Sequence, residues 1–262
     1  MDENQNRALI KPSFFERVRR LRAARRLWRV ETVYLTMLAA FGVLAVFARL
    51  YAYFAWDRAA AIAWQTFPLR GLPTLMCFVS LFGNGLTPFI LTTITIIIFL
   101  LLGLRSEAAA LLFSAGGGEL VNRLIKLFIA RPRPSSNLVQ VMIRSGSESF
   151  PSGHVTFYVC FFGFLFFVAY ALLPRGSLTR RLAFALTILP VALVGLSRVY
   201  LGAHWPSDVL GAYLFGGLWL ALSLDLYRRW KRHATLHPEI KAETAGNSED
   251  EPQSHRDPEK IN

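Results

Sequence analysis

The chain has 262 residues, of which 53% are hydrophobic, 13% aromatic and only 18% charged. This composition is typical of membrane proteins and argues against an ordinary soluble domain. The net charge of +12 raises the question of nucleic-acid binding, but nine of the 29 basic residues lie in the first thirty positions and another group follows the last apolar segment, in "YRRWKRH". Basic segments that flank apolar spans reflect membrane topology, and no nucleic-acid-binding module is recognisable, so we set that class aside.

The beginning of the chain is basic, with Phe, Leu, Val and Trp interleaved over residues 13–30. Two interpretations stay open for it: an amphipathic helix on an anionic membrane surface, or a charge cluster that only sets topology. The first thirty residues are too long and too polar for the start of a signal peptide, so we expect the first apolar span to be an uncleaved anchor.

Apolar segments of about twenty residues predict an all-α, polytopic membrane protein with six transmembrane helices. The expected spans are residues 31–55, 85–104, 107–129, 154–173, 181–200 and 206–227. Residues 57–84 are mixed in polarity, and their apolar part "TLMCFVSLF" is too short to span, which favours a re-entrant or interfacial piece. The sequence therefore divides into a basic cytoplasmic segment (1–30), a six-span domain (31–229) and a polar tail (230–262) that we expect to be disordered and cytoplasmic.

Alternation of six spans gives an orientation. The N-terminus, the turn at Arg105, "PRGSLTRR" and "YRRWKRH" then face the cytoplasm, as the positive-inside rule requires. The long loop of about residues 130–153 and the "YLGAHWP" connection lie on the opposite side. That long loop is itself basic, against the topological bias, which suggests a functional demand on its positive charge.

The end of the third span, "GGGELVNRLIKLFIARPRP", carries charges at helical spacing. Glu119, Asn122 or Arg123, and Lys126 share one helix face, which should point into the bundle because charge in lipid is costly. Glu119 and Arg123 are most simply a neutralising i,i+4 pair, whereas Lys126 has no obvious partner.

Two later segments combine helix starts with polar side chains at the same membrane face. "FPSGHVTFYV" opens the fourth span, where Ser152 can cap the helix, Gly153 allows close backbone approach and His154 lies on the first turn. "SRVYLGAHWPSD" opens the sixth span and places His204 within reach of Asp208, which would fix the tautomer of the imidazole.

A phosphate group is the partner that explains this collection of cations, helix N-termini, histidines and one carboxylate. Arginine and lysine neutralise phosphate oxygens, backbone N–H groups cradle them, one histidine attacks and the other acts as acid. His154, His204 and Asp208 could also bind zinc, but three adjacent cations oppose that reading. Cys77 and Cys160 are too isolated to form a disulfide framework or a metal cluster and are read as apolar filler.

The order and spacing of these residues resemble the three-part signature of the type-2 phosphatidic-acid phosphatase family, whose superfamily includes vanadium-dependent haloperoxidases. The matching motifs are Lys126-x6-Arg133-Pro134, Pro151-Ser152-Gly153-His154 and Ser197-Arg198-x5-His204-x3-Asp208. The resemblance covers about residues 85–227. It implies a metal-independent lipid phosphatase without cofactor, in which His204 forms a phosphohistidine, Asp208 orients it and His154 protonates the leaving group. It further implies that Lys126, Arg133, Ser152, Gly153 and Arg198 bind the phosphate.

The resemblance is specific for the family and weak for the substrate. The compact chain is similar to bacterial members, which predicts an inner-membrane protein acting on undecaprenyl diphosphate, phosphatidic acid, phosphatidylglycerol phosphate or a lipid A phosphate. Undecaprenyl diphosphate is favoured slightly, because Arg131 and Arg144 would suit a second phosphate, although both could be solvated loop charges. A lipid phosphotransferase using the same histidine and a phosphate-lipid transporter remain as alternatives.

Overall fold

The computed structural model describes residues 14–143, 146 and 148–236. Within these residues the chain is helical and has no β-strand, apart from an isolated bridge between Pro132 and Glu148. The elements in chain order are α1 (Phe14–Leu50), α2 (Ala55–Gln65), α3 (Leu72–Ser80), the 3-10 turn η2 (Leu81–Gly83), α4 (Thr87–Leu101), α5 (Arg105–Leu111), the π-helical turn η3 (Leu112–Gly117), α6 (Gly118–Ile129), α7 (Gly153–Leu172), α8 (Leu178–Tyr200) and α9 (Pro206–Leu236).

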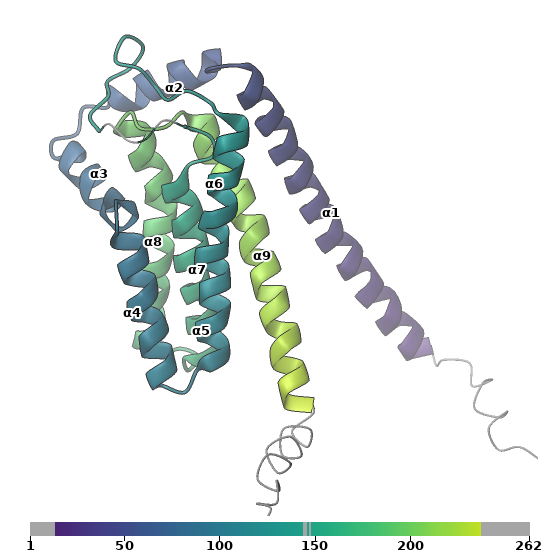
Figure 1. The fold of residues 1–262 in the computed structure, drawn as a ribbon. Helices are drawn as coiled ribbons and strands as arrows, with labels where there is room; N and C mark the ends of the chain where they lie inside the picture. Colours follow the sequence, from purple (N-terminus) through teal and green to yellow (C-terminus); the bar gives the residue numbers. More distant parts are fainter. Residues whose placement is uncertain (1–13, 144–145, 147, 237–262) are drawn as a thin grey trace, which may run out of the picture.

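Helix α7 is the centre of the bundle (Figure 1). Its sequence "GHVTFYVCFFGFLFFVAYAL" is apolar on every side, which is the pattern of a helix that is covered all round. Helices α6, α8 and α9 pack against it, and its buried residues Val155, Tyr158 and Phe164 belong to the main core. The Pro-Ser-Gly-His motif at its N-terminus therefore begins the central, largely buried helix of the bundle.

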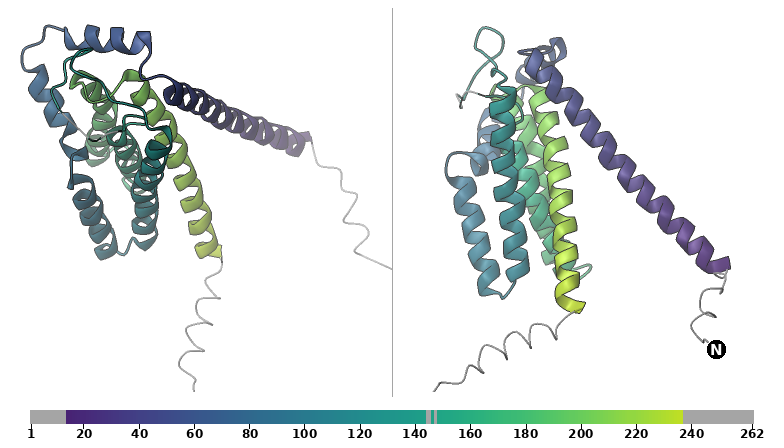
Figure 2. Two further views of the ribbon diagram at one scale, coloured as in Figure 1. Left: turned by 45° about the horizontal axis from the view of Figure 1, so that its top comes forward. Right: turned by 45° about the vertical axis from the view of Figure 1, so that its right-hand side comes forward.

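Helix α1 is one continuous helix that includes the basic residues from 14 onward. Its far end packs on α9 and α6, where Phe41 contacts the rings of Phe150 and Phe215. The rest diverges from the bundle, as Figure 2 shows from two directions. Residues 14–30 thus form a direct extension of the first apolar helix, and do not form a separate helix.

The elements between the long helices gather at one end of the bundle. Helix α2 lies across this end, above the N-terminus of α7 and the turn between α8 and α9, and the described parts of the loop between α6 and α7 (130–143, 146 and 148–152) lie beside it (Figure 1). Helix α2 is held there by Gln65, whose amide nitrogen donates to the carbonyl oxygens of Gln140 (2.7 Å) and Tyr200 (2.9 Å). The start of α1 and the end of α9 lie at the opposite end of the molecule.

The helices support a multi-pass membrane protein. Among the described residues, four helices are long and apolar enough to cross a membrane: Val30–Leu50, Gly153–Leu172, Leu178–Tyr200 and Pro206–Arg232. A fifth span results if Leu72–Gly83 and Thr87–Leu101, which meet at a 56° bend, are counted together. Residues 105–129 are helical throughout, but they are not among the helices that pass the same criterion. The expected number of six spans is therefore not confirmed.

Candidate active site

A cavity of about 400 Å³ lies between α4 and the run from η3 to α6, and it ends at the N-terminus of α7. The residues predicted from the motifs that line it are Lys126, Arg133, Gly153, His154, Arg198 and His204. The rest of its wall is mainly apolar and includes Phe89 and Leu120, which are both exposed on the outer surface of the bundle. The cavity is thus polar at its inner end and apolar where it opens sideways.

His204 is positioned by the tight turn between α8 and α9, where the N–H groups of Ala203 and His204 both donate to the Arg198 carbonyl oxygen. Its Nε2 lies 3.0 Å from Nη1 of Arg133. Because a guanidinium has only donors, Nε2 must accept, so the imidazole is neutral with its proton on Nδ1. That tautomer leaves a lone pair on Nε2, at the nitrogen that faces the cavity.

The electrostatic surroundings of His204 keep it neutral. Burial lowers the pKa of His204 well below its ordinary value, and the positive charges of Arg133, Lys126 and Arg198 lower it further. The Ser149 carbonyl opposes this shift. Burial also lowers the pKa of Arg133, while the carboxylates of Asp208 and Glu148 raise it. Because three cations surround it, the imidazole of His204 binds a proton weakly, and its neutral form remains available as a nucleophile at neutral pH.

His154 faces the same cavity from the first turn of α7. Its Nε2 lies 2.8 Å from Oδ1 of Asn84, in the loop that follows η2. An amide oxygen only accepts, so this contact favours a proton on Nε2 of His154. The backbone of Gly83 packs so closely on the imidazole that a Cβ there would lie 2.4 Å from Cδ2 of His154. The segment "FGNG", which the sequence indicates only as a turn, therefore supports the second histidine.

The three predicted cations converge on the cavity from three elements. Lys126 Nζ donates to the carbonyl oxygens of Glu148 (3.0 Å) and Ser149 (3.4 Å). Arg133 Nη1 donates to the carbonyl of Ala203 (2.7 Å). Arg198 is buried and donates from Nη1 to Ser80 Oγ (2.6 Å). These contacts hold the three cationic groups beside one another at the inner end of the cavity.

Ser152 and Gly153 occupy the N-terminus of α7 as expected, but in different ways. Ser152 is the N-cap residue, yet its hydroxyl makes no capping hydrogen bond and has no described partner. It is fully buried and does not line the cavity, whereas Gly153 does. Gly153 lines the cavity, so its predicted contact with phosphate is compatible with the structure. The hydroxyl of Ser152 must reach past the first turn of α7 to contact the same phosphate.

Asp208 lies near His204 but does not form the direct hydrogen bond to it that the motif suggests. Its Oδ2 lies 3.6 Å from Nδ1 of His204, beyond hydrogen-bond distance, and accepts from the Trp205 N–H (2.9 Å) and the Ser149 hydroxyl. Its Oδ1 accepts from Arg131 (2.6 Å). The carboxylate is close enough to stabilise positive charge on the imidazole, while its hydrogen bonds fix the surrounding loop.

Arg131 and Asp57 are the main site residues that sequence reasoning misses. Arg131 is 1% exposed and donates to Asp208, to Asp57 Oδ2 (2.9 Å), to Ser207 Oγ (2.7 Å) and to the Ala52 carbonyl (3.1 Å). Asp57, on α2, also accepts from the N–H and hydroxyl of Ser207 (2.8 and 2.7 Å). The expectation that Arg131 contacts a headgroup or is a solvated loop charge is therefore wrong, because two buried carboxylates occupy its guanidinium.

The remaining charges have simpler positions. Glu119 and Arg123 form the expected i,i+4 ion pair (3.0 Å) on the cavity wall. Arg144 lies outside the described residues. In the part of the chain that the structure covers, no three histidine, cysteine or acidic side chains form a group that could hold a metal ion. Cys77 is exposed and Cys160 is buried, and both are free thiols.

The comparison with known proteins concerns the part of the chain that contains this site. Residues 107–232 match the PAP2 superfamily, and this range contains every motif residue described above. This matched region, which is just under half of the chain, is called the PAP2 domain below. The PAP2 domain is similar to phosphatidylglycerophosphatase B of Bacillus subtilis, with 31% identity over 126 residues, covering 48% of this chain and 61% of that protein. It is also similar to lipid A 1-phosphatase of Rhizobium etli, with 35% identity over 142 residues, covering 48% of this chain and 56% of that protein.

A solved structure extends the likeness beyond the PAP2 domain. The crystal structure of a transmembrane PAP2 type phosphatidylglycerolphosphate phosphatase from Bacillus subtilis superimposes with a TM-score of 0.64 at 26% identity, covering 75% of this chain and 96% of that one. The likeness in sequence is shorter, since the match spans about three-fifths of the length of the curated relatives. The fold is therefore similar to that of this membrane PAP2 phosphatase.

Proposed function

We propose that this protein is an integral membrane phosphatase that removes the phosphate or diphosphate headgroup of a lipid through a phosphohistidine at His204. The observation that carries the proposal is the cavity itself, which joins two histidines and three cations at one end to an apolar wall open to the bilayer. The names of the similar proteins, which are lipid phosphatases, support the same class of substrate.

In the first step, the lone pair of His204 Nε2 attacks phosphorus. Arg133 turns from Nε2 to a phosphate oxygen, and Lys126 and Arg198 neutralise the charge that builds on the other oxygens in the pentacoordinate transition state. The bond from phosphorus to the lipid oxygen breaks as His154, which enters this step as an imidazolium, gives one proton to that oxygen and becomes neutral. The phosphorylated imidazole now carries positive charge, which Asp208 at 3.6 Å stabilises.

In the second step, water replaces the lipid alcohol. His154 takes a proton from the water as its oxygen attacks phosphorus, the bond to Nε2 breaks, and inorganic phosphate leaves. His204 returns to its neutral form with the proton on Nδ1. No metal or cofactor takes part in this scheme, because the three cations supply the charge that phosphoryl transfer requires.

The structure changes the argument about which lipid is bound. The sequence favours a diphosphate partly because Arg131 would hold the second phosphate, but Arg131 is buried against Asp57 and Asp208 and does not line the cavity. Lipid monophosphates therefore stand beside diphosphates as equal candidates. With the start of α1 and the end of α9 in the cytoplasm, the cavity faces the exterior or periplasm.

The test is phosphate release by the purified full chain in detergent, with excess chelator, on a panel of lipid monophosphates and diphosphates. The unmodified protein should release phosphate from at least one lipid, and His204→Ala should release none. Thr93→Ala, which changes a small side chain on the same cavity wall, is the matched control and should retain activity.

Each other result has a distinct meaning. Activity that requires a metal or survives in His204→Ala would refute the phosphohistidine mechanism. Transfer of the phosphoryl group to an added lipid alcohol, with little free phosphate, would identify the protein as a phosphotransferase. Binding of lipid phosphates with neither release nor transfer would favour a transporter.

A further inference from the structure

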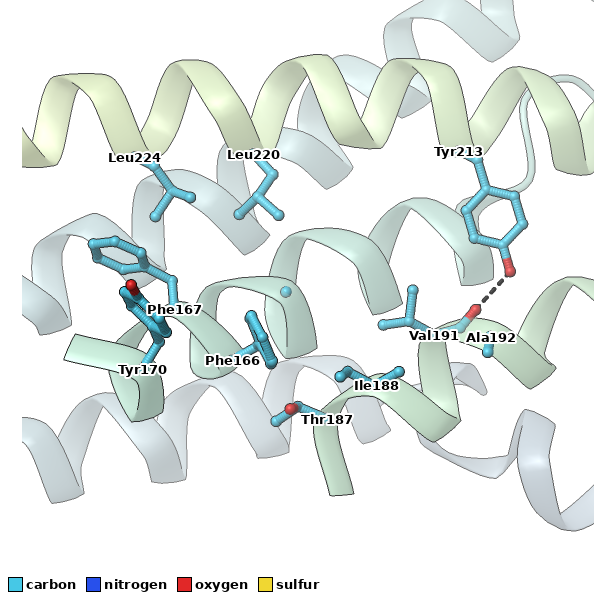
Figure 3. A pocket seen from close by; sticks show the side chains of 11 residues that line it. Phe166, Phe167, Tyr170, Thr187, Ile188, Val191, Ala192, Tyr213, Leu220 and Leu224 are labelled. Atoms are coloured by element: carbon cyan, nitrogen blue, oxygen red, sulfur yellow. Dashed lines mark hydrogen bonds between the residues drawn. The ribbon is translucent and has the colours of Figure 1, made fainter. Parts of the chain in front are cut away.

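A second cavity, separate from the phosphate site, lies between α8 and α9 on the surface of α7. It is an apolar groove of about 810 Å³, and Figure 3 shows its side chains pointing into the common space. The residues that line it are Gly163, Phe166, Phe167, Tyr170, Thr187, Ile188, Val191, Ala192, Tyr213, Leu220 and Leu224. None of them lines the phosphate cavity, so the groove belongs to a different part of the protein.

The groove exists because α8 and α9 both pack closely on α7 but have few contacts with each other. Near the phosphate site they are joined, since the Tyr213 hydroxyl donates to the Val191 carbonyl (2.5 Å), as the dashed line in Figure 3 marks. At the floor, Gly163 leaves room for Leu220, whose Cδ2 would lie 2.6 Å from a Cβ at that position. The Tyr213 hydrogen bond therefore marks the end of this groove that lies nearest the site, and the groove continues toward the other end of the bundle.

The length of the groove corresponds to one membrane leaflet. Tyr213 and Leu224 are eleven residues apart on α9, which is about 16 Å along a helix. Half of the hydrocarbon core of a bilayer is about 15 Å. An acyl chain of one leaflet would therefore extend along the groove from end to end.

The open end of the groove carries two arginines. The guanidinium of Arg180 lies 4.9 Å from the ring centroid of Tyr170, and that of Arg228 lies 5.4 Å from the ring centroid of Phe167. Both rings line the groove, so both cations are held at its edge. Among the described residues, neither arginine forms an ion pair with a carboxylate. Two cations at the end of an apolar groove are complementary to a phosphate attached to an acyl chain.

We propose that the α8–α9 groove binds an anionic phospholipid of the leaflet opposite the phosphate cavity. One acyl chain lies along Ile188, Leu220 and Leu224, and the headgroup phosphate lies between Arg180 and Arg228. This lipid is not a substrate, because Arg180 is eighteen residues from Arg198 on α8, about 27 Å along the helix. Its phosphate therefore cannot reach His204, and it acts as a structural ligand.

The test is native mass spectrometry of the full chain released from nanodiscs that contain equal amounts of phosphatidylglycerol and phosphatidylcholine. The unmodified protein should retain one phosphatidylglycerol. Arg180→Gln with Arg228→Gln should reduce this retention about 25-fold, taking about fivefold for each arginine at an anionic lipid surface. Arg175→Gln with Arg181→Gln removes the same charge from the same end and should retain the lipid.

A second pair of variants tests the groove without changing charge. Ile188→Trp fills the groove and should displace the lipid, whereas Leu189→Trp alters its equally exposed neighbour outside the groove and should not. Lys126→Ala should retain the lipid, which separates this site from the phosphate cavity whether or not the protein is a phosphatase. Equal retention of both phospholipids, or equal loss in each matched pair, would overturn the proposal. Retention of no lipid by the unmodified protein would also overturn it and leave a chain segment or a second copy as the occupant.

Discussion

Replacement of Arg131 by methionine should destabilise the protein and abolish most of its activity. Arg131 is the shared partner of Asp57 and Asp208, and the side chains of all three residues are 0% exposed. Methionine fills a similar volume but leaves two buried carboxylates without a counter-charge. Removing one partner of a buried ion pair typically costs about 3–5 kcal/mol, and here a single change leaves two charges unpaired. We therefore expect a loss at or above the upper end of that range.

The measurement is the free energy of unfolding in detergent, followed by circular dichroism, together with phosphate release. Arg229→Met is the matched control, because its ion pair with Asp225 is exposed and contributes at most about 1 kcal/mol. Arg131→Lys should fall between the two, since an ammonium has three donors for the four acceptors that Arg131 contacts. If Arg131→Met unfolds within about 1 kcal/mol of the unmodified protein, the buried network does not have the role assigned to it.

Two further predictions concern pH and packing. Because the pKa of His204 is lowered, the nucleophile stays neutral below pH 6.5, and kcat/KM should decline only as the pH falls through that lowered value. Arg133→Gln removes a cation beside His204 and should move this decline to higher pH, whereas Arg229→Gln, which is distant, should not. An unchanged pH profile in Arg133→Gln would show that the charge of Arg133 does not lower the pKa of His204. Gly211→Ala should lower the free energy of unfolding by about 1–3 kcal/mol, because the added Cβ would lie 2.4 Å from Cε2 of Phe150. Gly42→Ala is the control and should cost no stability, because the space around Gly42 is open. Equal stability of these two alanine variants would show that the packing around Gly211 relaxes freely.

The sequence predicts the polar end of the cavity well, because its motifs lie at fixed spacing on helix ends. His154 begins a helix that is apolar on all sides, and His204 precedes another, so local signals place both at the same end of the bundle. Helix ends and apolar length are local properties. The boundaries of α7 and α8 accordingly lie close to the expected spans, whereas α9 begins as expected but continues to Leu236, into the segment that we expected to be disordered.

The residues that support the site are distant in sequence, and no local signal marks them. Asp57 lies in a short mixed segment and meets Ser207 across 150 positions, while Asn84 meets His154 across 70. A single acidic residue in "AWDRAAAIAWQ" has the pattern of a solvated helix, and only the packing of α2 over the bundle buries it. The same packing explains why Arg131, expected at the surface, is buried.

The sideways opening of the phosphate cavity determines what can provide binding energy. A lipid that enters between α4 and α6 exchanges hydrocarbon neighbours for apolar side chains such as Phe89 and Leu120, and its tail gains almost nothing because it was never in water. Affinity must therefore arise from the phosphate and the cations around it, while the tail determines only how often the headgroup arrives. For a lipid phosphatase of the proposed kind, the meaningful substrate concentration is the mole fraction in the membrane plane, and diluting the lipid with inert detergent should slow turnover even when its amount per volume is unchanged.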